Sequence, residues 1–318
     1  MSLALALHIT YEIPCIVNLI ARRKPDFPSL TPVVPYPALL FMGSHEKTLI
    51  IGDLHIGWEA SLAEQGLHIP SQAPKFLERL KTIIRETDST HLIILGDVKH
   101  ATTKVELMEW HDVPAFFEAL LEIAKEIDVI PGNHDGNLEA LVPRGVHIHQ
   151  ISGLAIDNEV GIIHGHAWPK PEILGCKTIV VGHLHPMIAL TDAIGFSTIY
   201  QVWLKANSDG EILAKGLLKH LGVKLEGSVR ATMKERFNVD LANPHFIFLP
   251  PFNNLLSGQI MNKVPENSPI SDSHTGPLLK SSGIQIRNAD VYLIDGIYLG
   301  KLDVLPKTER FTRMCKFC

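Results

Sequence analysis

The chain has 318 residues, of which 46% are hydrophobic and 20% are charged, and its formal net charge is −5. This composition excludes a disordered or fibrous chain, and the length allows one large domain with or without an appendage. No global positive field exists, so nucleic-acid binding would need a local basic patch. Four scattered cysteines do not fit the disulfide framework of a secreted protein and favour a cytoplasmic localisation.

The first segment, residues 1–20, is apolar but fits neither a signal peptide nor a membrane helix. It contains His8, Glu12 and Pro14, and its basic cluster follows the apolar run instead of preceding it. We expect an additional helix or strand that packs on the core, and no membrane association. Residues 24–37 contain five prolines, which indicates an extended connector.

From residue 38 to residue 130 the sequence alternates between strand and helix patterns. Apolar runs predict strands at 38–42, 49–51, 92–95 and 127–130. Ser71 can cap an amphipathic helix after the second of these strands, and a further amphipathic helix with Pro114 near its start precedes the fourth. This order predicts parallel βαβ units.

Shorter strands follow and predict a second sheet, at residues 146–151, 160–163, 179–181, 187–190 and 199–204. Two sheets packed face to face, with helices outside, make an α/β protein with an α-β-β-α sandwich. Beyond about residue 215 the patterns are weaker. They predict a strand at 246–249, a long loop at 262–283, and a hairpin that turns at Asp295-Gly296.

These patterns divide the chain into three predicted regions. Residues 1–35 form an N-terminal extension, residues 36–260 the main domain, and residues 261–318 a C-terminal extension that contains the loop and the hairpin. The last region ends in a lone C-x-x-C pair, Cys315 and Cys318, which we interpret as part of a frayed tail. The role of this region and the oligomeric state stay open.

Five predicted strands are followed at once by residues that can bind metal ions. The segments are Asp53-Leu54-His55, Gly96-Asp97, Gly132-Asn133-His134-Asp135, His164-Gly165 and Gly182-His183-Leu184-His185. The carboxyl ends of strands in an open α/β sheet meet at one edge, where such proteins place their sites. One such residue alone is more often a cap, but the joint pattern predicts a site for two divalent ions, since imidazoles bind transition metals and a carboxylate can bridge them.

This ordered set resembles the pattern of the calcineurin-like metallophosphoesterases over roughly residues 36–205. The resemblance implies the same sandwich fold and a metal-dependent hydrolysis of phosphoesters. The ligands that it implies are, for the first ion, Asp53, His55 and His185, for the second ion, Asn133, His164 and His183, and for both ions, as the bridging carboxylate, Asp97.

The resemblance also implies that His134 is a catalytic residue that contacts the scissile phosphate or the leaving oxygen. We expect Asp135 to orient the imidazole of His134. His100 and His166 are candidates for substrate binding, although ordinary solvated histidines fit these positions equally well. The mixed nitrogen and oxygen ligands favour Mn, with Fe, Zn or Ni as alternatives. His147 and His149 alternate along a strand, and we interpret them as a partly exposed strand face.

A narrower resemblance concerns the substrate. Residues 51–59, followed by Leu62, Gly66 and Pro70, are similar to archaeal phosphoesterases related to the SbcD nuclease and to bacterial ligase-associated DNA-repair phosphoesterases. Residues 96–100, 182–186 and Pro251-Phe252-Asn253 are similar to the same branch, but 96–100 departs from the parent nuclease, which has an acid-rich segment after G-D. This branch implies a nuclease or phosphodiesterase that acts on DNA, with a protein partner in DNA repair.

Two other hypotheses stay open: a phosphodiesterase or phosphatase for small molecules or nucleotides, and a non-enzymatic scaffold that retains a metal site. Intact ligands and an intact His134 argue against the scaffold. DNA binding by an acidic protein needs cations beside the metal edge, and the candidates are Lys99, Lys104, Arg230, Lys234 and Arg236. A solvated helix face is the commoner explanation of the basic run 229–236.

Overall fold

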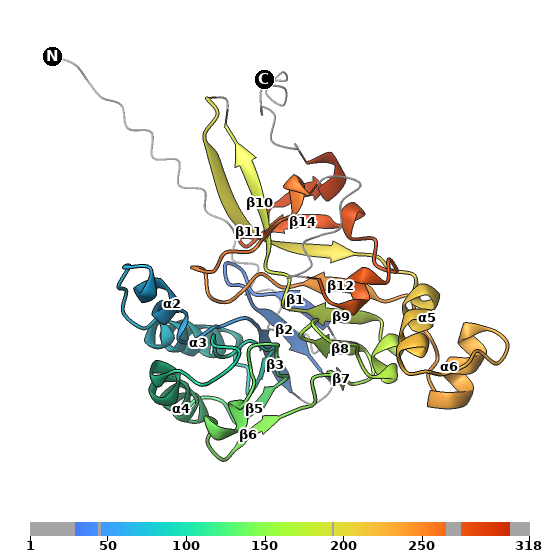
Figure 1. Ribbon diagram of the computed structural model, residues 1–318, viewed down its shortest axis with the longest axis horizontal. Coiled ribbons are helices and arrows are strands. Elements are labelled where there is room, and N and C mark those ends of the chain that lie inside the picture. Colours follow the sequence, from blue (N-terminus) through green and yellow to red (C-terminus); the bar gives the residue numbers. More distant parts are fainter. Residues whose placement is uncertain (1–28, 44–45, 193, 265–274, 306–318) are drawn as a thin grey trace.

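The computed structural model describes residues 29–43, 46–192, 194–264 and 275–305. Two β-sheets pack face to face. Helices α2, α3 and α4 lie on one side of the molecule, and α5 and α6 lie on the other (Figure 1). The predicted two-sheet α-β-β-α sandwich is therefore confirmed. Residues 1–20, Cys315 and Cys318 lie outside the described ranges, so the predictions made for them stay predictions.

The first sheet has six strands in sequence order: β1 (Ser29–Pro32), β2 (Leu39–Met42), β3 (Lys47–Ile51), β4 (His91–Ile94), β5 (Glu126–Val129) and β6 (Val146–Ile148). The first three pair antiparallel, and β3 to β6 pair parallel. Helices α2 (Trp58–Glu64), α3 (Ala73–Thr87) and α4 (Leu107–Leu121) accompany this half. Strand β4 is buried throughout because both faces of the sheet are covered.

Two sequence predictions in this half are wrong. The strand expected at 146–151 pairs with β5 in the first sheet, since Val146 aligns with Ile127, and it ends at Ile148. The second helix does not begin near Pro114 but at Leu107. Glu106 and Glu109 form a capping box there, which satisfies the first amides of the helix, so Pro114 lies inside it.

The second sheet has the order β13 (Gln259–Ile260), β10 (Pro186–Thr191), β11 (Ser197–Ala206), β12 (His245–Phe248), β9 (Thr178–Val181), β8 (Val160–Ile163) and β7 (Leu154–Ile156). β14 (Asp290–Leu293) pairs with β11 and with β15 (Tyr298–Lys301). The last two strands form the predicted hairpin, whose turn contains Gly296 at a φ of 89°. Helices α5 (Gly210–His220), α6 (Val229–Phe237) and the short α7 (Pro277–Lys280) complete this half.

A buried apolar layer joins the two sheets. Its largest members are Phe41, Ile50, Ile93, Ile162 and Trp203. Because this layer aligns the sheets, the carboxyl ends of the parallel strands β3, β4 and β5 lie at the same edge of the sandwich as those of β8 and β9. Within the described ranges, no helix is long and apolar enough to cross a membrane.

Candidate metal centre

The backbone at this edge is unusual in its conformation. Asp53, His55, Asp97, His183 and His185 all adopt positive φ angles between 44° and 63°. Such angles are uncommon for residues other than glycine, although Asp and His tolerate them better than most. Backbone strain of this kind persists where the surrounding structure enforces it, and it gathers at functional sites. The turns after β3, β4 and β9 therefore share a feature expected of a site.

Two glycines of the motifs allow these turns to approach each other. A Cβ atom on Gly132 would overlap Asp97 Oδ1, and a Cβ atom on Gly96 would overlap His164 Nδ1. Gly96 also has a φ of 71°, which favours glycine. The glycines are therefore needed for the contact between the loop after β4 and its neighbours.

The first group of candidate ligands consists of Asp53, His55, Asp97 and His185. All four are buried, and their ligand atoms lie within 4.8 Å of one another. His185 Nε2 lies 3.1 Å from Asp53 Oδ1, and His55 Nε2 lies 3.3 Å from Asp97 Oδ2. Asp53 Oδ2, His55 Nε2 and His185 Nε2 are buried without a hydrogen-bond partner. Buried polar atoms normally have partners, so these three fit ligands of a cation.

The second group consists of Asp97, His164 and His183, whose ligand atoms also lie within 4.8 Å of one another. His164 Nε2 lies 3.4 Å from Asp97 Oδ2 and 3.3 Å from Asn133 Oδ1. The other ring nitrogen, Nδ1, lies 2.9 Å from the carbonyl oxygen of Leu95, to which it can donate. This contact fixes the tautomer that leaves Nε2 as a ligand. Asp97 belongs to both groups, which is the position expected of a bridging carboxylate.

The charges of the two groups suit cations. Burial opposes ionisation of Asp97, but the nearby His164 and His55 hold its pKa well below the usual range. Burial lowers the pKa of His55, and burial together with the charge of His164 lowers the pKa of His183 to about 3. Neutral imidazoles and ionised carboxylates are the forms that bind metal ions.

His164 has the opposite shift. Burial lowers its pKa, but Asp97 and Asp53 outweigh this effect and raise it to about 10. A proton on His164 therefore compensates the two buried carboxylates. A divalent cation at the same place would compensate them instead, so this shift also fits a cation site.

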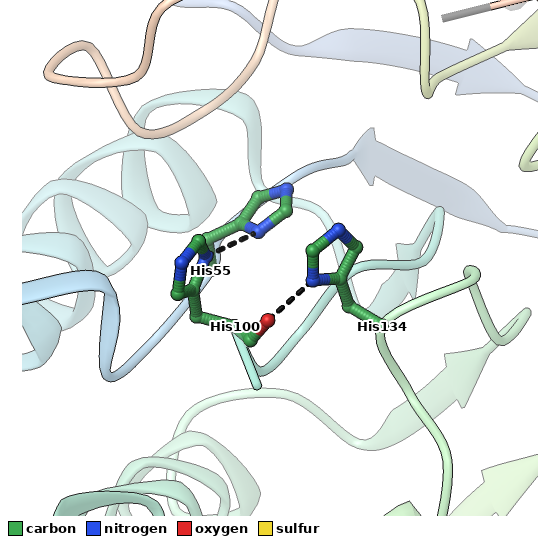
Figure 2. A group of neighbouring side chains, drawn as sticks. All are labelled: His55, His100 and His134. Atoms are coloured by element: carbon green, nitrogen blue, oxygen red, sulfur yellow. Dashed lines mark hydrogen bonds between the residues drawn. The ribbon is translucent and has the colours of Figure 1, made fainter. Parts of the chain in front are cut away.

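His134 lies beside the first group (Figure 2). Its ring centroid is 4.7 Å from that of His55, and its amide donates to Asp97 Oδ1 at 2.9 Å. His134 Nδ1 contacts the carbonyl oxygen of His100, which can accept a hydrogen bond from it (Figure 2). This contact makes Nδ1 the donor and leaves Nε2 as the nitrogen that can take up and release a further proton.

The expectation that Asp135 orients His134 is wrong. Asp135 Oδ1 accepts from the amides of Val98 and Lys99, and Oδ2 accepts from Gly132. The carboxylate thus holds the loop after β4 against the loop after β5. Burial and the charge of Asp97 raise the pKa of Asp135 to about 6. Adjacency in sequence did not determine the direction of this side chain, because the surrounding amides compete for it.

The two candidate substrate-binding histidines lie beside the two groups. His100 Nδ1 lies 3.2 Å from His55 Nδ1, so His100 can orient a candidate ligand (Figure 2). The ring of His166 lies 5.2 Å from that of His164, and its Nδ1 is buried without a hydrogen-bond partner. Burial, with neighbouring histidine charges, lowers the pKa of each to about 4, so both are neutral near pH 7.

Two buried residues that support these loops were not anticipated as site residues. Glu109 accepts from the amides of His100, Ala101 and Glu106, which ties α4 to the loop that carries His100. Asn253 donates to the carbonyl oxygen of Leu54 at 3.1 Å across 199 residues of sequence. Asn253 stands in the motif Pro251-Phe252-Asn253, which was the one sequence indication of its role.

The basic candidates for DNA contact are mostly occupied elsewhere. Lys99 is fully buried and donates to the carbonyl oxygen of Ala101, so it does not face a ligand. Each of the other four pairs with a carboxylate: Lys104 with Glu106, Arg230 with Glu211, Lys234 with Asp240, and Arg236 with Glu226. Helix α6, which carries three of them, packs on α5, on the far side of the molecule from α2–α4 (Figure 1). The basic run 229–236 therefore corresponds to a solvated, ion-paired helix face.

One comparison with known proteins gives a family match over more than half of the chain. The model of the calcineurin-like phosphoesterase family matches residues 46–241. No curated protein matches the sequence significantly. A solved structure with similarity to this chain is that of the nuclease MPE of Pseudomonas putida. The two are 16% identical, the alignment covers 84% of this chain and 98% of that chain, and the TM-score is 0.43.

Proposed function

Since the chain belongs to the calcineurin-like phosphoesterase family, whose members hydrolyse phosphoesters, we propose that it is a phosphodiesterase with two divalent metal ions. Asp53, His55 and His185 would bind the first ion, and Asn133, His164 and His183 the second. The observation that carries this proposal is the position of Asp97, whose carboxylate belongs to both groups of ligand atoms. A shared carboxylate holds two cations close together.

When bound, two such ions clamp a phosphate and lower the pKa of a coordinated water towards neutrality. The residues of this chain hold the site in shape. His164 is oriented through the Leu95 carbonyl, and His55 through His100. Burial of Asp53, Asp97 and His164 excludes bulk water from the ligands, which strengthens their electrostatic effect.

We assign the leaving-group proton to His134. Its Nδ1 donates to the carbonyl of His100, so Nε2 is the nitrogen that takes up a second proton, and the imidazolium formed in this way would give that proton to the leaving oxygen. Contact with the His100 carbonyl, and not with a carboxylate, fixes the ring. A carbonyl carries no full negative charge, so His134 can return to the neutral state after it has given up the proton. The role of Asp135 in this assignment is to position the loops, through the amides of Val98, Lys99 and Gly132.

For the substrate we propose DNA, with manganese as the preferred ion and a DNA-repair partner in the cytoplasm. The support is the similarity of residues 51–59 and of Pro251-Phe252-Asn253 to DNA-repair phosphoesterases. The second of these segments contacts the first, because the amides of Phe252 and Asn253 donate to the carbonyls of Gly52 and Asp53. We propose residues 36–260 as the metallophosphoesterase domain, to whose two sheets β1 and β14, from the regions on either side, add further strands. These segments are similar to the DNA-repair phosphoesterases as a group, so the proposal covers both exonuclease and endonuclease activity.

A small phosphodiester is the second candidate, and one observation favours it. The five basic residues expected to meet a DNA backbone are buried or paired with carboxylates. Binding of a polyanion depends on such cations and on the counterions that they displace. A small diester needs only the ions and the histidines His134 and His166.

One set of assays tests the proposal. Purified protein with Mn²⁺ would be given single-stranded DNA, duplex DNA and bis-p-nitrophenyl phosphate in parallel, with Asp97→Ala as the inactive control. Cleavage of DNA by the parent protein and none by the control would support the nuclease. Hydrolysis of bis-p-nitrophenyl phosphate without cleavage of either DNA would indicate that the substrate is a small phosphodiester and not DNA. No metal-dependent hydrolysis of any of the three would refute the phosphodiesterase.

A further inference from the structure

A second cluster of metal-binding side chains lies at the opposite end of the first sheet. The metal centre occupies the carboxyl ends of the strands, whereas this cluster begins at the amino ends of β4 and β5 and runs along one face of the sheet to β6. It contains His91 on β4, Glu126 and Asp128 on β5, and His147 on β6, with Glu46 and His149 beside them. None of these residues belongs to the phosphoesterase site.

The strand register brings these side chains together. His91 aligns with Glu126, and Asp128 aligns with His147. Aligned residues on neighbouring strands project from the same face, with their Cβ atoms about 4.5–5.5 Å apart. Glu126 and Asp128 are two positions apart, so both project from that face as well. One face of three adjacent strands therefore carries two carboxylates and two imidazoles.

Asp128 is the buried centre of the cluster. Its side chain is only 7% exposed, and Oδ2 lies 2.8 Å from His91 Nε2 in a hydrogen bond. Oδ1 is buried and makes no hydrogen bond, although His149 Nε2 lies 3.0 Å from it. A buried carboxylate oxygen without a partner is costly unless something outside the chain satisfies it. This oxygen is independent evidence that the cluster takes a ligand.

The distances suit a tetrahedral transition ion. Zinc binds imidazole nitrogen and carboxylate oxygen at about 2.0–2.2 Å, which places neighbouring ligand atoms roughly 3.3 Å apart. His147 Nδ1 lies 3.4 Å from Asp128 Oδ1 and 4.0 Å from Glu126 Oε1. The three ligand atoms of Glu126, Asp128 and His147 lie within 4.8 Å of one another. The Glu126 and His147 side chains are 46% and 63% exposed, so neither is held in place by packing as Asp128 is.

The charge of the cluster also favours a cation. Glu46, Glu126 and Asp128 supply three carboxylates. Burial raises the pKa of Asp128, but His91 and His149 outweigh this effect and lower it, so Asp128 is ionised near pH 7. The hydrogen bond from His91 compensates only the Oδ2 side of this carboxylate. The Oδ1 side faces His149 at 3.0 Å and His147 at 3.4 Å, and these imidazoles compensate its charge only when they are protonated.

We propose that Glu126, Asp128 and His147 bind one divalent transition ion of the Zn²⁺ class, at a site separate from the phosphoesterase centre. His91 and His149 orient the Asp128 carboxylate from its two sides. The ion would join β5 to β6, a three-residue edge strand whose residues are only partly buried. Its role is therefore to anchor the edge of the first sheet, and it takes no part in hydrolysis.

The test counts bound zinc by elemental mass spectrometry after equilibrium dialysis of the full chain against Zn²⁺. The variants are His147→Ala and Glu126→Gln, both at partly exposed positions that the fold tolerates. His111→Ala is the matched control, because His111 also pairs with a carboxylate, Asp112 at 2.7 Å, but is 86% exposed and stands on α4. Hydrolysis of bis-p-nitrophenyl phosphate and the melting temperature with and without Zn²⁺ are measured on the same samples.

We expect His147→Ala and Glu126→Gln to bind about one zinc ion fewer per chain than the parent protein and the His111→Ala control. Both variants should lose part of the zinc-dependent rise in melting temperature while their hydrolytic activity is unchanged. Equal zinc content in all four proteins would overturn the proposal and leave the cluster as an ion-pair network only. A lower zinc content accompanied by loss of hydrolysis would also overturn it, because the site would then not be separate. If no protein of the set hydrolyses the diester, the proposed function fails, while the zinc count still decides this inference.

Discussion

Glu109 offers the sharpest test of how the fold supports the chemistry. Its carboxylate is 1% exposed and accepts from His100 N at 2.9 Å, Ala101 N at 2.7 Å and Glu106 N at 2.9 Å. His100 in turn accepts from His134 through its carbonyl and contacts His55 through its ring. Replacing Glu109 should therefore disturb both the stability of the fold and the position of the proposed general acid.

The magnitude follows from the number of bonds lost. A hydrogen bond to a charged group contributes about 1.5–3 kcal/mol, and an amide left unsatisfied in the interior costs about 1–3 kcal/mol. In Glu109→Ala all three amides lose their acceptor, but the amides of the partly exposed His100 and Ala101 can recover water. We therefore expect a loss of about 3–5 kcal/mol in the free energy of unfolding. Glu109→Gln keeps the oxygen that accepts two of the bonds, so its loss should be about 1–2 kcal/mol.

The assay combines urea unfolding with turnover on two diesters, one with a good and one with a poor leaving group. Misplacement of a catalytic group by about 1 Å can lower turnover by roughly 10²-fold. If Glu109 acts through His134, Glu109→Ala should lose more activity on the poor leaving group, and Glu109→Gln should restore most of it. The reasoning is refuted if Glu109→Ala unfolds within about 1 kcal/mol of the parent protein. Equal activity losses on both esters would reduce Glu109 to a structural role.

Four further predictions follow from the site and its surroundings. Asp97→Ala should no longer bind two ions together, and metal analysis that finds both at normal affinity would contradict the bridging role. His134→Ala should keep both ions and lower turnover by roughly 10²–10⁴-fold, with a smaller loss on p-nitrophenyl esters, whose leaving group hardly needs a proton. An equal loss on esters with good and with poor leaving groups would contradict the general-acid role. Substitution of Arg230 and Arg236 together should leave DNA affinity and its salt dependence unchanged, since both side chains are paired with glutamates. A flatter salt dependence in the double variant would show that this helix contacts DNA. Burial lowers the pKa of His91, but the hydrogen bond and charge of Asp128 outweigh this and raise it. The stabilisation by His91 is therefore complete below about pH 6.5 and is lost as the pH rises through the folded pKa. The melting temperature of the parent protein should exceed that of His91→Gln more at about pH 6 than at about pH 9, which lie below and above the ordinary pKa, and a constant difference would contradict this linkage.

Much of the architecture was predictable because its causes are local. Strands β3, β4, β5, β8 and β9 are rich in apolar residues, and one of the five metal motifs follows each of them. The side-chain period of a strand and the capping residues of a helix are visible in sequence. For the same reason the order of the candidate ligands along the chain could be aligned with a family pattern.

The wrong predictions concern which sheet a strand joins or which groups a side chain contacts, and not whether the strand or helix forms. The strand at 146–151 was recognised, but its pattern cannot state which sheet it joins, because Val146 and Ile148 would be buried in either. Asp135 follows His134 in sequence, yet its carboxylate accepts from two backbone amides of the turn after β4 and from the Gly132 amide of its own turn. Asn253 acts through a contact across 199 residues, and a single sequence carries no direct record of such a contact. Glu109 acts on amides only three to nine residues before it, so its position at the start of α4 was a local signal that we did not use.

The hydrogen bond from Asn253 to Leu54 joins two segments that the ribosome synthesises at different times. The turn that carries Asp53 and His55 receives the Asn253 side chain at Leu54, 199 residues later in the chain. At a synthesis rate of about 5–20 residues per second, roughly 10–40 s pass between the two segments. For the first part of that interval the nascent chain holds Asp53 and His55 without His183 and His185, and throughout it Asn253 is missing. The metal edge is therefore completed late in translation, and capture of ions before that moment would involve incomplete sets of ligands.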